Sequence, residues 1–314
     1  MDRVRRLPVL LLALLPVLAH ADDVRQPVGD ALYKAYCAFY DYDKTAPLNA
    51  QVVSKEDNGG TDVELIKFDS ANHERVPGYL LVPPAGKKHP LILVFHGYQQ
   101  SKESILPFAP LMGQAGVDYA ILCLDAQYHG DRKKDNQDIL SNDFAKNEQA
   151  IIQTAIDYRR ALDYVATRPD IDTSRVGVLA ASMGAMIAAE FVALEPQRIK
   201  TAVFAVGGAD WITILKESQL ENLQKLRANQ PPDWSTLRRF TDPIDPLNFA
   251  PHFGDRPILL INAKDDQVMP KAAAERLHAV AVGKPLVKEW VDGGHELPPD
   301  TTLPMVLEWF QQHL

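Results

Sequence analysis

The chain has 314 residues, of which 46% are hydrophobic, so it can bury one large α/β core or two smaller ones. Its net charge is −8 and it has no cluster of Lys and Arg, which argues against nucleic acid or an anionic membrane as a partner.

The first 21 residues have the pattern of a secretory signal peptide. Arg3, Arg5 and Arg6 precede an apolar run over residues 7–18, and Ala19-His20-Ala21 fits a cleavage site. The run is shorter than the roughly 20 residues that a membrane-spanning helix needs, which disfavours a membrane anchor. We predict cleavage after Ala21 and a periplasmic or secreted protein without stable membrane insertion. Cleavage removes one acidic and three basic side chains, which changes the net charge from −8 to −10.

The segment that follows, residues 22–60, is predicted to be an N-terminal extension. Leu32, Tyr36, Phe39 and Tyr40 have helical spacing, which predicts a short helix over 30–40 packed on the domain. Alternating residues on both sides of Asn58-Gly59-Gly60 predict a hairpin with strands at 51–56 and 61–68. A third strand is predicted over 76–82, where Pro83-Pro84 ends it.

From residue 91 onward, solid apolar runs alternate with helical patterns. The predicted strands lie at 91–95, 119–124, 175–180, 201–206, 257–262 and 286–291, and the clearest helices at 147–168, 183–194 and 303–314. Runs of this kind predict strands buried on both faces of a parallel sheet, with helices on both sides.

Residues 207–256 interrupt this alternation. They hold a polar helical pattern over about 212–229 and a proline-rich run to Pro251. A connection of this length is usually functional, so we predict a lid or a pocket wall, with a surface insertion that has no role as the alternative.

Cys37 and Cys123 are the two cysteines of the chain. In an exported protein they could form one disulfide. Cys123 lies in an apolar strand pattern, however, where free buried cysteine is common. The sequence leaves both alternatives open.

Ser182 is the residue most indicative of function. It follows a predicted strand, precedes a predicted helix, and has Ala180 and Gly184 two residues to each side. Small residues at these positions permit a sharp strand-to-helix turn that exposes a nucleophilic serine. The alternative is a serine that only caps the helix.

A carboxylate and a histidine follow two later strands of the predicted sheet. Asp265 and Asp266 come after the strand at 257–262, and His295 comes after the last strand. Because ligands bind at the carboxyl ends of parallel strands, these residues and Ser182 are expected at one rim. Serine needs a base to take its proton, and a carboxylate orients the imidazole that does so.

With these residues the chain resembles an α/β-hydrolase, and among these the dienelactone hydrolase-like and prolyl oligopeptidase-like esterases and peptidases. The similarity covers residues 62–314. Its motifs are listed here in chain order: Val76-Pro-Gly-Tyr-Leu-Leu-Val-Pro-Pro84, His96-Gly97, Arg168-Pro-Asp-Ile-Asp172, the turn at Ser182, Asp245-Pro246 and Gly294-His295. The resemblance implies an α/β fold with a mostly parallel, eight-stranded sheet, helices on both faces, and a hydrolase domain over 61–314 that includes a lid-like insertion at 207–256.

The resemblance also implies roles for particular residues. Ser182 would be the nucleophile, His295 the base, and Asp266 the acid, because Pro270 and Ala263 have the family's spacing to Asp266. Asp265 stays an alternative. The backbone N–H groups of Tyr98 and Met183 would form the oxyanion hole. Ala180 departs from the glycine usual at that position, which puts in doubt the subfamilies where that glycine is the norm.

Three other polar residues near the predicted rim have weaker claims to a role in catalysis. His96 is interpreted as a structural residue beside the oxyanion hole. His129 and Arg132 either form a salt-bridged or capping contact or line the pocket. No motif indicates a metal or nucleotide cofactor.

The sequence thus predicts an exported serine hydrolase that acts on a small-molecule carboxylic ester through an acyl-enzyme. A prolyl oligopeptidase-like peptidase and a non-catalytic binding protein on a hydrolase scaffold are the alternatives. About forty residues of the mature chain precede the hydrolase pattern, which counts against a peptidase with a gating domain. The acyl group, the alcohol and the oligomeric state are not predicted.

Overall fold

Nine strands form one sheet in this computed structural model, which describes residues 25–84, 86–115, 117–229 and 233–314. The strands are β1 (Gln51–Asn58), β2 (Thr61–Asp69), β3 (Arg75–Val82), β4 (His89–Phe95), β5 (Ala120–Leu124), β6 (Ile171–Ala181), β7 (Thr201–Ala205), β8 (Ile258–Ala263) and β9 (Leu286–Val291). Their order is β1-β2-β3-β5-β4-β6-β7-β8-β9. The strands from β4 to β9 run parallel to one another, whereas the pairs β1–β2, β2–β3 and β3–β5 are antiparallel.

The predicted mostly parallel sheet is therefore confirmed, but the predicted count of eight strands is wrong. The additional strand is β1, which comes from the predicted N-terminal extension and pairs with β2 along its whole length. Gly59 and Gly60 have φ values of 67° and 89°, a region that glycine adopts without strain, and they form the hairpin turn between the two strands. The predicted signal peptide lies outside the described residues, and the domain boundaries stay predictions.

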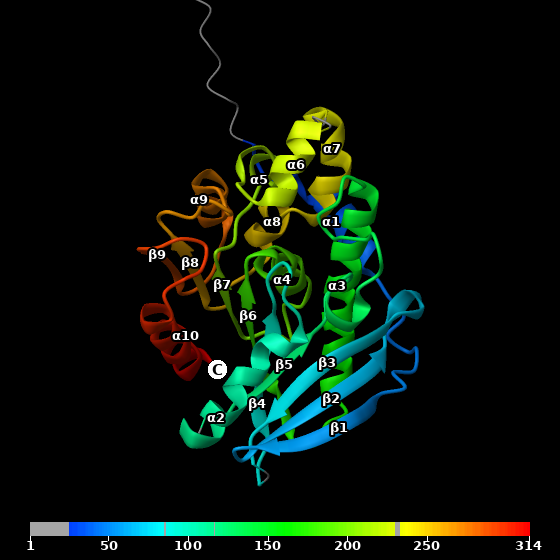
Figure 1. Cartoon of the computed structure of the whole chain (residues 1–314), viewed down its shortest axis with the longest axis vertical. Helices are drawn as coiled ribbons and strands as arrows, with labels where there is room; N and C mark the ends of the chain where they lie inside the picture. The colour runs from blue at the N-terminus through cyan, green and yellow to red at the C-terminus, as the bar shows by residue number, and fades with distance from the viewer. Residues whose placement is uncertain (1–24, 85, 116, 230–232) are drawn as a thin grey trace, which may run out of the picture.

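Helices cover both faces of the sheet (Figure 1). Side chains alternate along β4: Leu91, Leu93 and Phe95 join one apolar cluster, while Ile92 and Val94 join the clusters of the opposite face. The first face packs against α3 (Phe144–Val165), α4 (Met183–Leu194), α8 (Pro246–Phe249) and α9 (Lys271–Val280). The second face packs against α2 (Ala109–Ala115) and α10 (Pro299–His313).

The segment 207–256 lies at one end of the molecule, where Figure 1 shows α5, α6 and α7 together. These helices are α5 (Trp211–Glu217), α6 (Glu221–Asn229) and α7 (Trp234–Thr241). The single helix predicted over about 212–229 is thus wrong. Hydrogen bonds to another segment interrupt it: Ser218 Oγ donates to the Val268 carbonyl at 2.6 Å, and Gln219 N donates to the Gln267 carbonyl at 2.8 Å.

The N-terminal part of the described chain is tied to the same segment by an ion network. The Arg25 guanidinium contacts Asp210 at 3.1 Å, Asp245 at 2.7 Å, and also Asp242. Asp245 is fully buried, and its carboxylate accepts hydrogen bonds from the N–H groups of Asp210, Trp211 and Leu247. One guanidinium therefore neutralises part of the charge of three carboxylates, of which Asp210 precedes α5 and Asp245 precedes α8.

The helix predicted over 30–40 is present as α1 (Asp30–Cys37) followed by the 3-10 turn η1 (Ala38–Tyr40). Its predicted packing is only partly right, because Tyr40 is fully buried whereas Leu32 and Phe39 are exposed. Tyr33 stacks on the ring of His252 with centroids 3.5 Å apart, which gives His252 a packing role.

The remaining short 3-10 segments are η2 (Ala71–His73), η3 (Lys102–Phe108), η4 (Gly130–Arg132), η5 (Asp242–Ile244) and η6 (Ala250–His252). Cys37 and Cys123 are both free. Within the described residues, no helix is both long and apolar enough to cross a bilayer.

Candidate active site

Ser182 stands at a sharp turn between β6 and α4. Its backbone has φ 54° and ψ −121°, a conformation that non-glycine residues adopt at a cost and that clusters at functional sites. Ser182 N donates to the Ala205 carbonyl at 2.9 Å, which holds the turn against β7. Although Ser182 is at the N-cap position, its side chain makes no capping hydrogen bond, so the helix-cap alternative does not describe its hydroxyl.

Gly184 allows α4 to approach the end of β4. A Cβ atom at this position would lie 2.2 Å from the Phe95 carbonyl oxygen and 2.6 Å from the His96 carbonyl oxygen. Both distances are shorter than real Cβ contacts, and both partners are backbone atoms. The glycine two residues after the serine is therefore required to bring the start of α4 beside the turn that follows β4.

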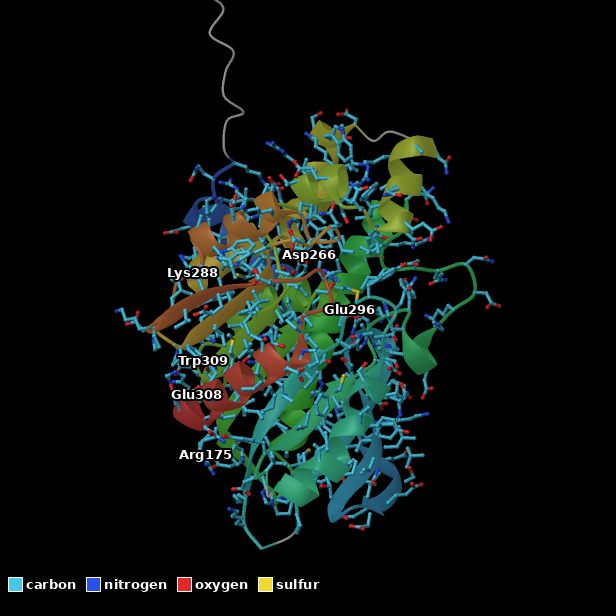
Figure 2. All side chains as sticks on the ribbon, turned by 60° about the vertical axis from the view of Figure 1, so that its left-hand side comes forward. Arg175, Asp266, Lys288, Glu296, Glu308 and Trp309 are labelled. Carbon is cyan, nitrogen blue, oxygen red and sulfur yellow. The ribbon has the colours of Figure 1, made fainter. Side chains whose placement is uncertain are left out.

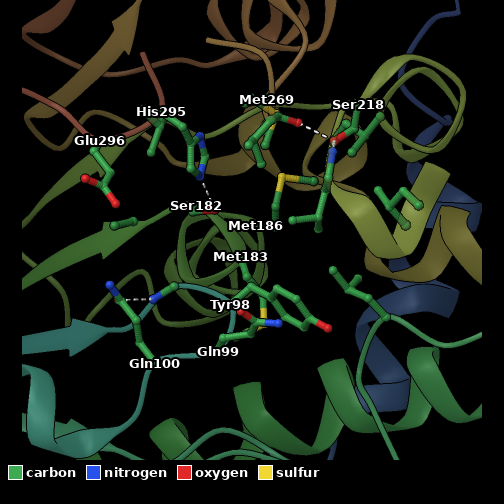
Figure 3. Close-up of a pocket in the computed structure, with 18 of the residues that line it drawn as sticks. Tyr98, Gln99, Gln100, Ser182, Met183, Met186, Ser218, Met269, His295 and Glu296 are labelled. Carbon is green, nitrogen blue, oxygen red and sulfur yellow. Dashed lines mark hydrogen bonds between the residues drawn. The ribbon is translucent and has the colours of Figure 1, made fainter. Parts of the chain in front are cut away.

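Ser182, His295 and Asp266 form one hydrogen-bonded chain. Ser182 Oγ lies 2.8 Å from His295 Nε2 (Figure 3). His295 Nδ1 lies 2.8 and 3.0 Å from the two oxygens of Asp266. A carboxylate can only accept, so Nδ1–H donates to Asp266 and leaves Nε2 to accept from the serine hydroxyl. The three residues follow β6, β9 and β8, so the expectation that they meet at one rim is met.

Asp266 is held in place by the backbone of its own loop. Its Oδ1 accepts hydrogen bonds from Val268 N at 2.8 Å and Met269 N at 2.9 Å, and its side chain is 3% exposed. Asp265 is exposed, and its side chain does not contact His295. Of the two aspartates considered from the sequence, Asp266 is therefore the partner of the histidine.

The amides of Tyr98 and Met183 both border the same pocket as Ser182. Within the described part of the chain, neither N–H group donates a hydrogen bond to the protein, so both can serve an acceptor in the pocket. The turn that carries Tyr98 is fixed by two bonds, because Gly97 N donates to Gln100 Oε1 at 2.9 Å and Gln100 N donates to the Gly97 carbonyl at 3.2 Å. Figure 3 shows Tyr98 and Met183 close together below Ser182.

His96 supports this turn and does not act as a second base. Its Nδ1 donates to the Gly97 carbonyl at 2.9 Å, and its Nε2 accepts from Ala126 N at 3.1 Å. Burial lowers the pKa of His96 to about 4, so the ring is neutral at physiological pH. The structural interpretation of His96 agrees with these contacts.

Arg132 and His129 also have structural contacts. Arg132 is buried, pairs with Asp157 at 2.6 Å and Glu74 at 3.1 Å, and donates to the Asp125 carbonyl. His129 is buried and its Nδ1 donates to the Gln127 carbonyl at 2.8 Å. Neither Arg132 nor His129 is among the described residues that line the pocket beside Ser182.

The pocket beside Ser182 has a volume of about 440 Å³. Its wall is mostly apolar, and the segment 207–256 supplies Trp211, Ile214, Leu220 and Leu223 to it. Met186 and Met269 are among the apolar residues that other segments supply.

The side chain of Tyr98, which lines this pocket, is held by two side chains that the sequence did not indicate, Asp138 and Asn222. Tyr98 Oη donates to Asp138 Oδ2 at 2.5 Å, and Asn222 of α6 donates to the same tyrosine oxygen. Asp138 also accepts from Leu140 N at 2.8 Å. The turn after β4, the loop after β5 and α6 are thus joined at one point. No local sequence pattern marks this contact, because its members are far apart in the chain.

Comparison with known proteins identifies the class that this fold and site define. The chain belongs to the alpha/beta hydrolase fold family, which matches residues 90–251. This confirms the resemblance predicted from the sequence.

Individual relatives fall in the same class. The chain is 27% identical over 258 residues to esterase YjfP of Escherichia coli K12, a match that covers 80% of this chain and all of the relative. Acetyl xylan esterase 1 of Thermoanaerobacterium sp. JW/SL YS485 has a similar structure, with a TM-score of 0.77, 17% identity, and coverage of 92% of this chain and 95% of that chain. An acylaminoacyl peptidase of Pyrococcus horikoshii has a TM-score of 0.61 and 16% identity, over 86% of this chain and 42% of the peptidase. At these identities the two structures show a common fold.

Proposed function

We propose that the protein is an exported serine carboxylesterase that cleaves a carboxylic ester through an acyl-enzyme. The observation that supports this most strongly is the chain of hydrogen bonds from Ser182 through His295 to Asp266. The similarity to an E. coli esterase supports the same reaction class. The apolar pocket beside the serine is suited to the acyl part of an ester.

The reaction proceeds in two halves. Ser182 Oγ attacks the ester carbonyl while His295 Nε2 takes its proton, and the negative charge on the carbonyl oxygen is stabilised by the N–H groups of Tyr98 and Met183. The C–O bond to the alcohol then breaks, and His295 returns the proton to the departing alcohol oxygen. In the second half, His295 takes a proton from water as the water oxygen attacks the acyl carbonyl. The bond from the acyl carbon to Ser182 Oγ then breaks, His295 returns the proton to Oγ, and the acid leaves. Asp266 keeps the imidazole in the tautomer that this requires.

The test is Ser182→Ala in protein that lacks residues 1–21, assayed on short p-nitrophenyl esters. Removal of a triad serine typically costs several orders of magnitude in kcat. A variant that keeps a rate near that of the wild type, after correction for contaminating esterase, would refute the assignment.

The two alternatives are separated by two further measurements. A dipeptide p-nitroanilide hydrolysed faster than the esters would favour the peptidase. A folded wild-type protein that a fluorophosphonate probe does not label would favour a non-catalytic binding protein.

Export is the second part of the proposal, and it rests on the sequence of residues 1–21. Expression of the whole chain in a Gram-negative host, followed by mass measurement of the protein in the periplasmic fraction, tests it. The expected mass is that of a chain whose first residue is Asp22. Full-length protein confined to the cytoplasm would contradict the proposed export.

A further inference from the structure

The pocket beside Ser182 has two sides of different polarity. Figure 3 shows Met186 and Met269 to one side of Ser182, and Gln100 and Glu296 to the other. The first side continues into the apolar wall that the segment 207–256 supplies. The second side is polar, because Gln100 and Glu296 are both exposed at the mouth of the pocket. An ester bound here therefore meets two different environments at its two ends.

The position of His295 decides which end of the ester lies on which side. Its Nε2 must deliver a proton to the alcohol oxygen as the C–O bond breaks, so the alcohol has to lie on the side of His295. Glu296 is the next residue in the chain, on the same loop after β9. The acyl group then points the other way, toward the apolar wall.

Glu296 gives the alcohol side a charge. Among the described residues that line the pocket, it is the only acidic or basic side chain besides His295. No ion pair with Glu296 occurs within the described part of the chain. Figure 2 shows it near Asp266 and away from Glu308 and Trp309 of α10. A carboxylate without a cationic partner next to the departing alcohol repels an anionic alcohol and attracts a cationic one.

From these observations we propose that the enzyme selects esters with an apolar acyl group and a neutral or cationic alcohol, and that Glu296 determines the selection against anionic alcohols. The proposal rests on the proposed esterase function and names the substrate class of that same site.

The experiment compares three butyrate esters that differ in the charge of the alcohol. Choline and 3,3-dimethylbutanol have the same shape but differ by one positive charge, and 4-hydroxybutanoate carries a negative charge. Hydrolysis is followed by acid release at low ionic strength in the wild type, Glu296→Gln and Glu296→Lys. Asp300→Asn is the matched control, because it removes one exposed negative charge from the same end of the chain but does not line the pocket.

The measured quantity is the ratio of kcat/KM for the choline ester to kcat/KM for the anionic ester. In the wild type this ratio is expected to be about 10, because a charge a few ångströms away near a surface changes binding by about this factor. The ratio should fall severalfold in Glu296→Gln, invert in Glu296→Lys, and stay unchanged in Asp300→Asn. A ratio that is the same in wild type and Glu296→Lys would overturn the role of Glu296.

A second series tests the orientation with a fixed neutral alcohol and acyl chains of increasing length. In the wild type kcat/KM should rise about threefold to fourfold per added methylene until the pocket is full, and then fall. Leu223→Trp should move the maximum to shorter chains, while Glu296→Gln leaves it in place. A change in the chain-length maximum on substitution of Glu296, with none for Leu223→Trp, would overturn the orientation. If Ser182→Ala is as active as the wild type, the esterase proposal itself fails, which is a separate result.

Discussion

Replacement of Asp266 by Asn changes one atom of the hydrogen-bonded chain, and the structure predicts how the amide will be oriented. Oδ1 accepts from Val268 N, Met269 N and His295 Nδ1, whereas Oδ2 accepts from His295 alone at 2.8 Å. An NH₂ group in place of Oδ1 would leave two backbone donors without acceptors, at a cost of about 1–3 kcal/mol each. The amide oxygen therefore keeps the Oδ1 position, and the NH₂ group faces His295.

This orientation favours the wrong tautomer of the histidine. The NH₂ group takes the Oδ2 position, which is 2.8 Å from Nδ1 and closer than the oxygen at 3.0 Å, so it donates to an unprotonated Nδ1 and the ring proton moves to Nε2. Nε2–H then points at Ser182 Oγ and cannot accept the serine proton. In serine proteases the corresponding Asp-to-Asn change leaves the geometry intact and lowers kcat about 10⁴-fold, which corresponds to about 5 kcal/mol of transition-state stabilisation. We expect a loss of the same order here.

The assay is the steady-state hydrolysis of p-nitrophenyl butyrate by Asp266→Asn near neutral pH, with Asp265→Asn as the matched control. Because the Asp265 side chain does not contact His295, the control should keep a rate within a few-fold of the wild type. Thermal unfolding midpoints of both variants should stay close to that of the wild type, since no volume is lost. Activity of Asp266→Asn within tenfold of the wild type, or a larger loss in Asp265→Asn, would refute the reasoning.

Three further substitutions test the fold around the site. Gly184→Ala is expected to lower both stability and esterase rate, because its Cβ would lie 2.2 Å from a backbone oxygen of β4. The control is Gly294→Ala, because a Cβ at Gly294 meets nothing within 4 Å. Equal effects of the two substitutions in thermal melts and rate assays would contradict the packing argument. The buried Glu190 carboxyl, neither oxygen of which has a hydrogen-bond partner among the described residues, has a pKa raised well above 4.5 by burial. The unfolded chain releases this proton first, so wild-type stability should fall as the pH rises above 4.5, and urea unfolding of Glu190→Gln should show a flatter pH profile; parallel profiles would argue against it. Arg25→Gln leaves three carboxylates, including the buried Asp245, without their guanidinium, and is expected to cost about 3 kcal/mol in chemical unfolding at neutral pH, with a smaller loss in acid. A loss that is the same at both pH values would show that the effect is not electrostatic.

The parallel part of the sheet and the order of the site residues could be predicted because each depends on local pattern. Solid apolar runs such as 91–95 mark strands buried on both faces, and the residues just after them must meet at one rim. Ser182, Asp266 and His295 follow three such runs, so their proximity could be inferred before any contact was known.

What could not be predicted depends on contacts between distant segments. The helix expected over about 212–229 breaks at Ser218 because this residue and Gln219 bond to Val268 and Gln267. Likewise, β1 joins the sheet through pairing with β2, which a hairpin pattern suggests but which a family-based count of strands leaves out.

The contact of Tyr98 with Asp138 and Asn222 has no local signal at all, since the three residues come from separate parts of the chain. Glu296 directly follows His295 in the sequence, but its proposed role in substrate selection depends on which other residues line the pocket.

The most direct test of the central claim is to trap the acyl-enzyme. Protein that lacks residues 1–21 is mixed with p-nitrophenyl butyrate, quenched in acid within one turnover, and digested for mass spectrometry. The account predicts one butyryl group on the peptide that contains Ser182, no such group in Ser182→Ala, and a burst of p-nitrophenol equal to the adduct formed. Hydrolysis that continues with no adduct, or an adduct on a residue other than Ser182, would contradict it.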